Sequence, residues 1–201
     1  MKNLKEISLK YDVDKLELGF LDHYEEKFED IRNNVTKVLE IGVETGRSHR
    51  LWLEYFPNAR IYGYDIFEYG YDELLIILYG GDFDIIIDDG GHTMKQQQVS
   101  LKYLFDSVKP GGYYIIEDLH TCSGQWRSLY GYEVISKGDT LTTDLLDSLE
   151  NSDTSVQETN YLSREDINKI RDSIEYCNTK VGVNKYKNYN WPTLLSFMKL
   201  K

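Results

Sequence analysis

A series of short strand-like segments, each separated from the next by a helical pattern or a turn, most constrains the fold of this chain. Residues 84–89 (DIIIDD) contain three consecutive isoleucines, which is typical of a parallel strand buried on both faces. Three further segments have strand character: residues 37–41 (KVLEI), 60–66 (RIYGYDI) and 113–118 (YYIIED). Helical patterns at residues 48–55 and 93–108 lie between them. This alternation predicts βαβ units and a mostly parallel sheet with right-handed crossovers.

The flanking segments complete an α/β fold. Residues 14–32 predict one amphipathic helix, because Phe20, Tyr24 and Phe28 recur at spacings of four. Toward the C-terminus, two helical patterns precede two strands that suit an antiparallel pair: residues 141–149, 164–170, 173–183 and 194–200. We expect a single domain over residues 1–201, with a Rossmann-like, doubly wound sheet and helices on both faces. Its parts would be an N-terminal helical segment (1–35), the sheet, and acceptor-side and closing elements (122–201).

Composition narrows the classes of partner. The formal net charge is −11, which argues against nucleic-acid phosphates and anionic membranes as main partners. No apolar run approaches the roughly 18–20 residues of a membrane span, and residues 1–15 lack the apolar block of a signal peptide. The two cysteines, Cys122 and Cys177, lie far apart and lack metal-binding spacing. These features predict a cytoplasmic protein.

Ligands of open parallel sheets bind beyond the carboxyl ends of the strands, so the residues there indicate function. The first predicted strand leads through Glu40 and Gly42 to Gly46. The glycines let the backbone pass close to a ligand, and Glu40 suits a ligand with ammonium and sulfonium groups, such as S-adenosylmethionine (SAM), better than a pyrophosphate. Asp65 follows the loop by about 20 positions, a spacing that suits the ribose hydroxyls of SAM or NAD. An ordinary strand-to-helix turn and a helix-capping aspartate are the alternatives.

Acidic pairs end the next two strands. Asp88 and Asp89 follow one, and Glu117 and Asp118 follow the other. If these strands pair, four carboxylates converge, and their repulsion raises some pKa values unless a cation lies between them. Such hard oxygen ligands suit Mg²⁺, with Mn²⁺ or Ca²⁺ as alternatives. His92 lies close to Asp89 in sequence and could act as a general base. Solvated turns with capping roles are the alternative reading.

Three segments together resemble the metal-dependent sugar O-methyltransferases of macrolide biosynthesis, the macrocin and mycinamicin type. They are residues 38–48 (VLEIGVETGRS), 83–92 (FDIIIDDGGH) and 110–121 (PGGYYIIEDLHT). Asp14, Lys15, His23 and Tyr24 also resemble an N-terminal segment of that family. The resemblance covers residues 14–121 best and implies the class I SAM-dependent methyltransferase fold.

This resemblance implies a role for each strand-end residue. Mg²⁺ would be bound by Asp89, Glu117 and Asp118, with His92 as the catalytic base. SAM would be lined by Glu40, Gly42, Gly46 and Asp65, with Asp88 in support. The implied activity is SAM-dependent, Mg²⁺-assisted methylation of a hydroxyl on a sugar or glycan-type small molecule. Homo-oligomers are also compatible with the resemblance.

The interval between Asp65 and Phe83 departs from the family pattern. These residues are 18 positions apart, where the family usually has a helix, a strand and another helix. The interval has room for one helix, around residues 71–78, which predicts that the edge strand beside the Asp65 strand is missing. A degenerate SAM-fold binding protein therefore stays an alternative, as does a SAM methyltransferase with a nitrogen or catechol-like acceptor. Glu40 and the lack of G-x-G-x-x-G disfavour a NAD(P)-dependent oxidoreductase.

Several other residues have less specific interpretations. His49 is predicted to lie on the surface, and His120 to contact the acceptor or to serve structure. Trp126, Tyr130 and Tyr132 suit either core packing or stacking on a ligand. The sequence leaves open the identity of the acceptor, the oligomeric state and the choice of metal.

Overall fold

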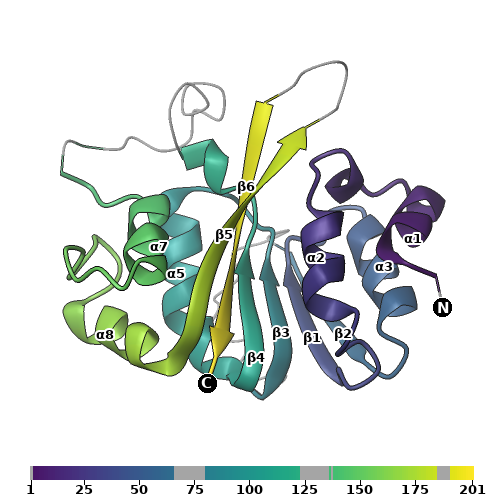
Figure 1. Ribbon diagram of the computed structural model, residues 1–201, viewed down its shortest axis with the longest axis horizontal. Helices are drawn as coiled ribbons and strands as arrows, with labels where there is room; N and C mark the ends of the chain where they lie inside the picture. The colour runs from purple at the N-terminus through teal and green to yellow at the C-terminus, as the bar shows by residue number, and fades with distance from the viewer. Residues whose placement is uncertain (1, 66–79, 123–135, 137, 185–190) are drawn as a thin grey trace.

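A computed structural model describes residues 2–65, 80–122, 136, 138–184 and 191–201 (Figure 1). Its six strands form one sheet in the order β2-β1-β3-β4-β6-β5. The strands are β1 (Lys37–Ile41), β2 (Arg60–Tyr64), β3 (Phe83–Asp88), β4 (Val108–Ile116), β5 (Ile174–Asn184) and β6 (Trp191–Leu200). Strands β1 to β4 are parallel, whereas β6 is antiparallel to β4 and β5 to β6. The predicted α/β, mostly parallel sheet is confirmed, as is the antiparallel closing pair.

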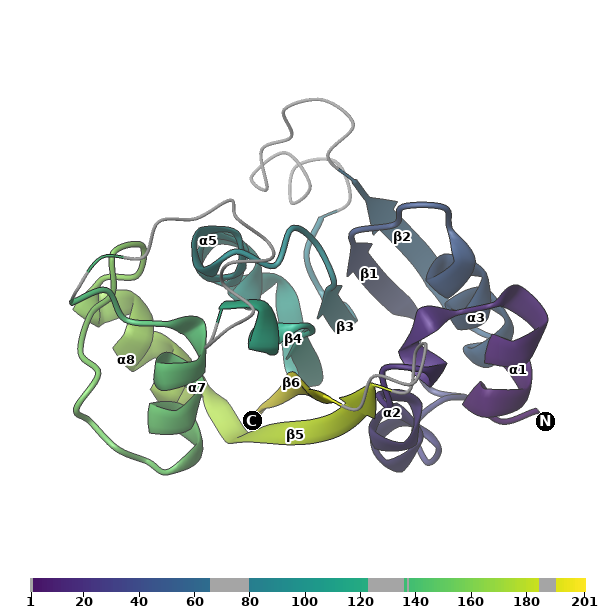
Figure 2. The same ribbon diagram turned by 90° about the horizontal axis from the view of Figure 1, so that it is seen from above.

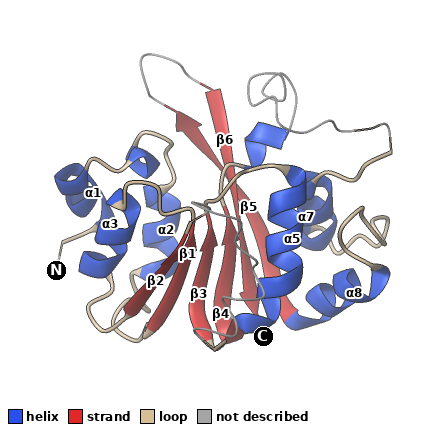
Figure 3. Cartoon of the chain, turned by 180° about the vertical axis from the view of Figure 1, so that it is seen from behind, coloured by secondary structure: helices blue, strands red, loops and turns tan. Residues whose placement is uncertain are grey.

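Helices cover both faces of the sheet (Figures 2 and 3). One face carries α1 (Leu4–Tyr11), α2 (Leu21–Phe28) and α3 (Arg47–Tyr55), and the other carries α5 (Met94–Leu104), α7 (Thr142–Glu150) and α8 (Arg164–Ser173). The isoleucines of β3 show why one strand serves both layers. Ile85 and Ile87 join the core beneath α1–α3, and Ile86 joins the core beneath α5, α7 and α8. Successive side chains of a strand point to opposite faces, so a strand buried on both sides needs a continuous apolar run.

The N-terminal segment differs from the single helix predicted over residues 14–32. It forms a short 3-10 helix, η1 (Asp14–Leu16), a turn and then α2. Gly19 causes the break, because its φ of +76° is left-handed and a Cβ there would lie 2.9 Å from the backbone nitrogen of Val183. Phe20, Tyr24 and Phe28 are still buried as predicted. The break allows η1 to point in a different direction from α2.

The connection from α5 to β4 also differs from the prediction. The helix ends at Leu104 rather than near residue 108, and η2 (Phe105–Ser107) follows it. β4 then begins at Val108, which pairs with Phe83 at the start of β3. A register shift separates that pair from the regular ladder that begins with Ile85 and Tyr113. Pro110 lies within this irregular stretch, where its missing N–H is tolerated.

β2 is the outer strand at one edge, and within the described ranges no strand pairs with its outer side. The predicted absence of an edge strand beside β2 stays a prediction, because residues 66–79 lie outside the described ranges. The helix predicted around residues 71–78 lies outside the described residues, as do Trp126, Tyr130 and Tyr132. None of the described helices has the length and apolarity needed to cross a membrane.

The order of the strands determines where a ligand can bind. The chain passes from β1 to β2 on one side and then returns to β3 on the other side of β1. Such a switch point opens a crevice at the carboxyl ends of the two central strands. The strand ends are also held in register, because the N–H of Asp89 donates to Ile41 O and the N–H of Glu117 to Asp88 O, both at 2.9 Å. The loops after β1, β3 and β4 therefore meet at one place.

Candidate active site

A cavity of about 450 Å³ lies at this switch point, a size typical of small-molecule sites. Five of the predicted site residues line it: Gly42, Asp65, Asp89, His92 and Asp118. The other predicted residues, Glu40, Gly46, Asp88 and Glu117, are not part of its lining. Asp14 and Glu44 add carboxylates to the wall, and Arg47 adds a cation. The predominance of acidic groups favours a cationic ligand.

The glycine loop after β1 needs Gly42 for a close approach of two backbones. Gly42 has a φ of +84°, and a Cβ there would lie 1.9 Å from the carbonyl oxygen of Asp89. No side chain can be accommodated at that distance, so glycine allows the loops after β1 and β3 to touch. Gly46, at a φ of +75°, is the N-cap of α3. Both predicted glycines thus shape the loop, although only Gly42 lines the cavity.

Asp65 organises the same loop from the end of β2. Its Oδ2 accepts hydrogen bonds from the backbone N–H groups of Val43 at 2.9 Å and Glu44 at 2.5 Å. Glu44 is itself left-handed, with a φ of 47°, a conformation that needs such support. The predicted bond from Asp65 to ribose hydroxyls stays a prediction, and the carboxylate does line the cavity.

Glu40 lies behind the loop instead of on the cavity wall. It is fully buried, and its Oε1 accepts a 2.9 Å hydrogen bond from Trp52 Nε1 on α3. Its Oε2 lies 3.4 Å from His49 Nδ1. The prediction that His49 lies on the surface is therefore wrong: the ring points inward, against Glu40 and Gly63. Glu40 therefore connects β1 to α3 behind the loop that lines the cavity.

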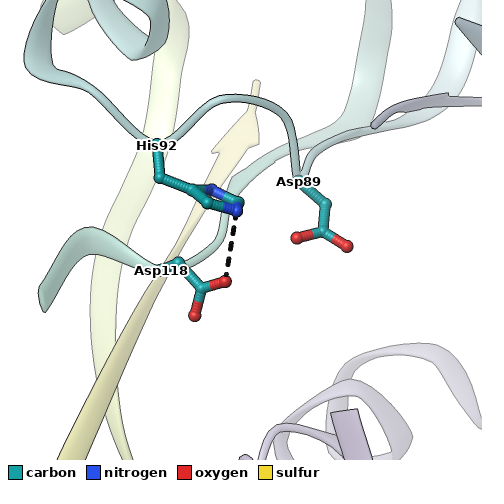
Figure 4. A group of neighbouring side chains, drawn as sticks. All are labelled: Asp89, His92 and Asp118. Carbon is teal, nitrogen blue, oxygen red and sulfur yellow. Dashed lines mark ion pairs between the residues drawn. The ribbon is translucent and has the colours of Figure 1, made fainter. Parts of the chain in front are cut away.

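Asp89, His92 and Asp118 converge from the loops after β3 and β4 (Figure 4). One ligand atom from each lies within 4.8 Å of the others, and His92 Nε2 is 3.5 Å from Asp118 Oδ2. His92 and Asp118 are both left-handed, with φ of 57° and 51°. Thr121 Oγ1 holds the two loops together, since it lies 2.8 Å from the carbonyl oxygens of both residues. Disfavoured backbone conformations maintained in this way are common at functional sites.

The charges of this group are poorly neutralised by the protein. Burial raises the pKa of Asp89 to about 6, against the opposing effect of Lys15, and burial raises the pKa of Asp118 to about 6 as well. Burial lowers the pKa of His92, which keeps its imidazole neutral. Asp118 Oδ1 is buried and accepts no hydrogen bond from any described residue. The two carboxylates, with one buried oxygen unsatisfied, fit a divalent cation, and the neutral imidazole beside them suits a proton acceptor.

Glu117 does not belong to this group in the structure. It is fully buried, its Oε2 accepts a 2.8 Å bond from Lys15 Nζ, and its Oε1 accepts a short bond from the Tyr24 hydroxyl. Its predicted role as a metal ligand stays a prediction. Asp88 is also buried and accepts a 3.3 Å bond from the N–H of Gly90, which supports the turn toward His92.

Sequence reasoning missed Lys15, Tyr24 and Thr121. Lys15 is fully buried, although a lysine in a predicted amphipathic helix is usually exposed. The sequence feature that could have identified Lys15 is its place in the Asp14–Lys15 pair, which resembles a segment of the methyltransferase family. His120 Nδ1 accepts a 3.4 Å bond from the N–H of Leu194 on β6 and lies 3.8 Å from Asp118 Oδ1. Its contact with the acceptor stays a prediction.

Comparisons with known proteins identify relatives of this chain. No family model matches the chain. The chain is 39% identical over 147 residues to mycinamicin VI 2''-O-methyltransferase of Micromonospora griseorubida, which covers 59% of this chain and 36% of that enzyme. It is 34% identical over 157 residues to demethylmacrocin O-methyltransferase of Streptomyces fradiae, covering 66% of this chain and 39% of that enzyme.

Among solved structures, the chain is similar to the MycE methyltransferase of the mycinamycin biosynthetic pathway, in complex with Mg, S-adenosylhomocysteine (SAH) and mycinamycin VI. The TM-score is 0.69 at 29% identity, over 99% of this chain and 53% of that one. The chain spans about half the length of that structure, and its sequence matches cover little more than a third of the curated relatives. The chain therefore has the fold of SAM-dependent methyltransferases and is related to the mycinamicin- and macrocin-type sugar O-methyltransferases.

Proposed function

We propose that this chain is a SAM-dependent, Mg²⁺-assisted O-methyltransferase that acts on a hydroxyl of a sugar or glycan-type small molecule. The observation that carries this proposal is the convergence of Asp89, His92 and Asp118 beside the Gly42 loop, in one cavity. Relatedness to enzymes named for O-methylation of glycosylated natural products supports the reaction class. The structure of MycE with Mg and SAH supports the two cofactors.

Each side of the cavity has a separate role in this proposal. When bound, SAM supplies an electrophilic methyl group and the divalent cation supplies charge that lowers the pKa of an acceptor hydroxyl. The Gly42 loop, maintained by Asp65, would provide the surface for the cofactor. Asp89 and Asp118 would hold the cation through carboxylate oxygens. The loops therefore bring both reactants to adjacent positions, which is itself a large part of catalysis.

His92 takes the proton in this proposal. Because burial lowers its pKa, the imidazole is neutral at physiological pH and can accept a proton at Nε2. Asp118 Oδ2 lies 3.5 Å from the same nitrogen and favours the imidazolium that results. The acceptor oxygen, once deprotonated, would attack the methyl carbon in line, so that the O–C bond forms as the bond from that carbon to the sulfonium sulfur breaks and SAH leaves.

The first test is binding. Calorimetry with SAH, with and without Mg²⁺, should give an SAH dissociation constant in the micromolar range, and NAD should not bind. Failure of the wild-type protein to bind SAH in either condition would contradict the proposal. Glu158→Gln changes an exposed acidic position outside the cavity and should bind SAH as wild type does.

The second test is turnover. SAH production should be followed with a panel of glycosylated small molecules, catechols and amines, in Mg²⁺ and in EDTA. Mg²⁺-dependent SAH formation with a glycosylated acceptor supports the proposal. Methylation of catechols or amines alone favours the other acceptor class, and SAH binding without turnover of any acceptor favours a binding protein.

A further inference from the structure

Lys15 occupies an unusual position for a lysine. Its side chain is 1% exposed, yet it comes from the short helix η1, far in sequence from the strand ends. Its Nζ lies 2.5 Å from Asp89 Oδ2 and 2.8 Å from Glu117 Oε2. One ammonium group therefore joins the loop after β3 to the loop after β4.

The surroundings keep this ammonium charged. Burial lowers the pKa of Lys15, but the carboxylates of Asp89 and Glu117, with smaller effects from Glu40 and Asp14, raise it well above its usual value. Removing a buried partner from such a cluster leaves an uncompensated charge, which is strongly unfavourable. While no metal is bound, Lys15 thus neutralises part of the negative charge of the carboxylates that follow β3 and β4.

The same bonds determine which oxygens remain for a divalent cation. Lys15 and Tyr24 occupy the two oxygens of Glu117, and Lys15 also occupies Oδ2 of Asp89. In contrast, Asp118 Oδ1 accepts no hydrogen bond from the described part of the chain. A divalent cation that took Glu117 as a ligand would have to compete with Lys15 at Oε2 or with Tyr24 at Oε1.

We propose that Lys15 is an internal counter-cation that competes with the divalent cation for Asp89 and Glu117, and so weakens the affinity of the site for metal. This inference rests on the proposed function, because it takes the strand-end carboxylates as the cation site. Lys15 holds the carboxylates in place in the metal-free protein. It makes metal binding depend on the position of the N-terminal segment, through η1.

The test is the dissociation constant for Mn²⁺, measured without catalysis by the electron paramagnetic resonance signal of free Mn²⁺. In Lys15→Met the dissociation constant should fall at least about tenfold, because a unit positive charge in contact with the ligands is removed. The metal-free variant should unfold at a lower temperature than wild type, and Mn²⁺ should raise its unfolding temperature more than it raises that of wild type. Lys15→Arg, which keeps the charge, should bind Mn²⁺ as wild type does.

A control separates charge at the site from the loss of a lysine elsewhere. Lys10→Met removes an exposed lysine that pairs with Glu54. It should leave the dissociation constant for Mn²⁺ within about threefold of wild type. If Lys15→Met does not fold, Lys15→Met/Glu117→Gln removes the ion pair as a unit, and it should bind Mn²⁺ at least about tenfold more tightly than Glu117→Gln alone.

The outcomes distinguish this inference from the proposed function. Equal or weaker Mn²⁺ binding in Lys15→Met than in wild type overturns the role of Lys15, even where SAH binding and transfer are intact. Failure to bind Mn²⁺ in both proteins overturns it too. Tighter Mn²⁺ binding in the variant, with no SAH binding by either protein, supports the role of Lys15 and contradicts the methyltransferase proposal.

Discussion

The two ends of β3 hold acidic side chains in opposite surroundings. At the amino end, Asp84 Oδ2 accepts bonds from Thr36 N, Thr36 Oγ1 and Lys37 N, each at 2.9 Å, and Oδ1 pairs with Lys109. Burial raises the pKa of Asp84, but these donors outweigh it and lower the pKa below its usual value. At the carboxyl end, Asp89 pairs with Lys15, which it shares with Glu117.

This difference separates a carboxylate that serves the fold from one that is available for a ligand. Asp84 ties the loop before β1 to β3, and its charge is satisfied by the protein itself. Asp89 and Asp118 have pKa values raised to about 6, primarily by burial, so the folded protein bears a cost to hold their charge. Buried carboxylates with raised pKa values are typical of sites where a bound cation or a reaction compensates for the free energy of keeping them charged.

The largest expected effect tests the carboxyl end. Asp118→Asn should lower the rate of methyl transfer by about three to four powers of ten, because Lewis-acid assistance is worth several kcal/mol and each 1.4 kcal/mol is tenfold. SAH affinity, measured by calorimetry, should stay within about threefold of wild type. Full transfer activity in this variant would contradict a catalytic role for the carboxylates that follow β3 and β4.

His92 should be the next most sensitive position. His92→Gln should reduce transfer by about two to three powers of ten, within the usual range for loss of a general base. Mn²⁺ should still bind, since both carboxylates remain. Rates measured across pH should lose their rising limb in the variant, and an unchanged pH profile would contradict the role of His92 as base.

The amino end should respond in stability instead of activity. Asp84→Asn should lower the free energy of unfolding by about 2 kcal/mol, because hydrogen bonds to a charged group are replaced by weaker ones. Urea denaturation measures this effect. SAH and Mn²⁺ affinities should be unchanged, and a selective loss of either would mean that the two ends are coupled.

The smallest expected effect concerns pH. Asp118 has a folded pKa of about 6, above its ordinary value of 3.8. Between these values the folded state binds more protons than the unfolded state, so this group makes the protein less stable as pH rises. Metal-free Asp118→Asn should therefore be more stable than wild type at pH 7, and the difference should shrink toward pH 4. Mg²⁺ should stabilise wild type and reduce the difference, while a difference independent of pH would contradict the raised pKa.

Local patterns were sufficient for most of the fold. The isoleucine run of β3 and the spacing of Phe20, Tyr24 and Phe28 predicted their burial, because periodicity reports which faces are covered. The boundaries failed where a single position overrode the pattern. Gly19 breaks the predicted helix through a left-handed turn against Val183, a contact that arises only once β5 is in place.

The sequence by itself determined the chemistry that is available at the strand ends. Asp88, Asp89, Glu117 and Asp118 were identified from their positions after apolar strands, with His92 close to Asp89, and parallel pairing predicted that they converge. The structure brings Asp89, His92 and Asp118 together. Tertiary structure decided which partners the strand-end groups contact. Glu40 contacts Trp52 and His49, and Glu117 contacts Lys15 and Tyr24. The reason is that a buried charge takes whichever partner the packed layers bring within reach, and that partner can come from an element more than 100 positions away in sequence.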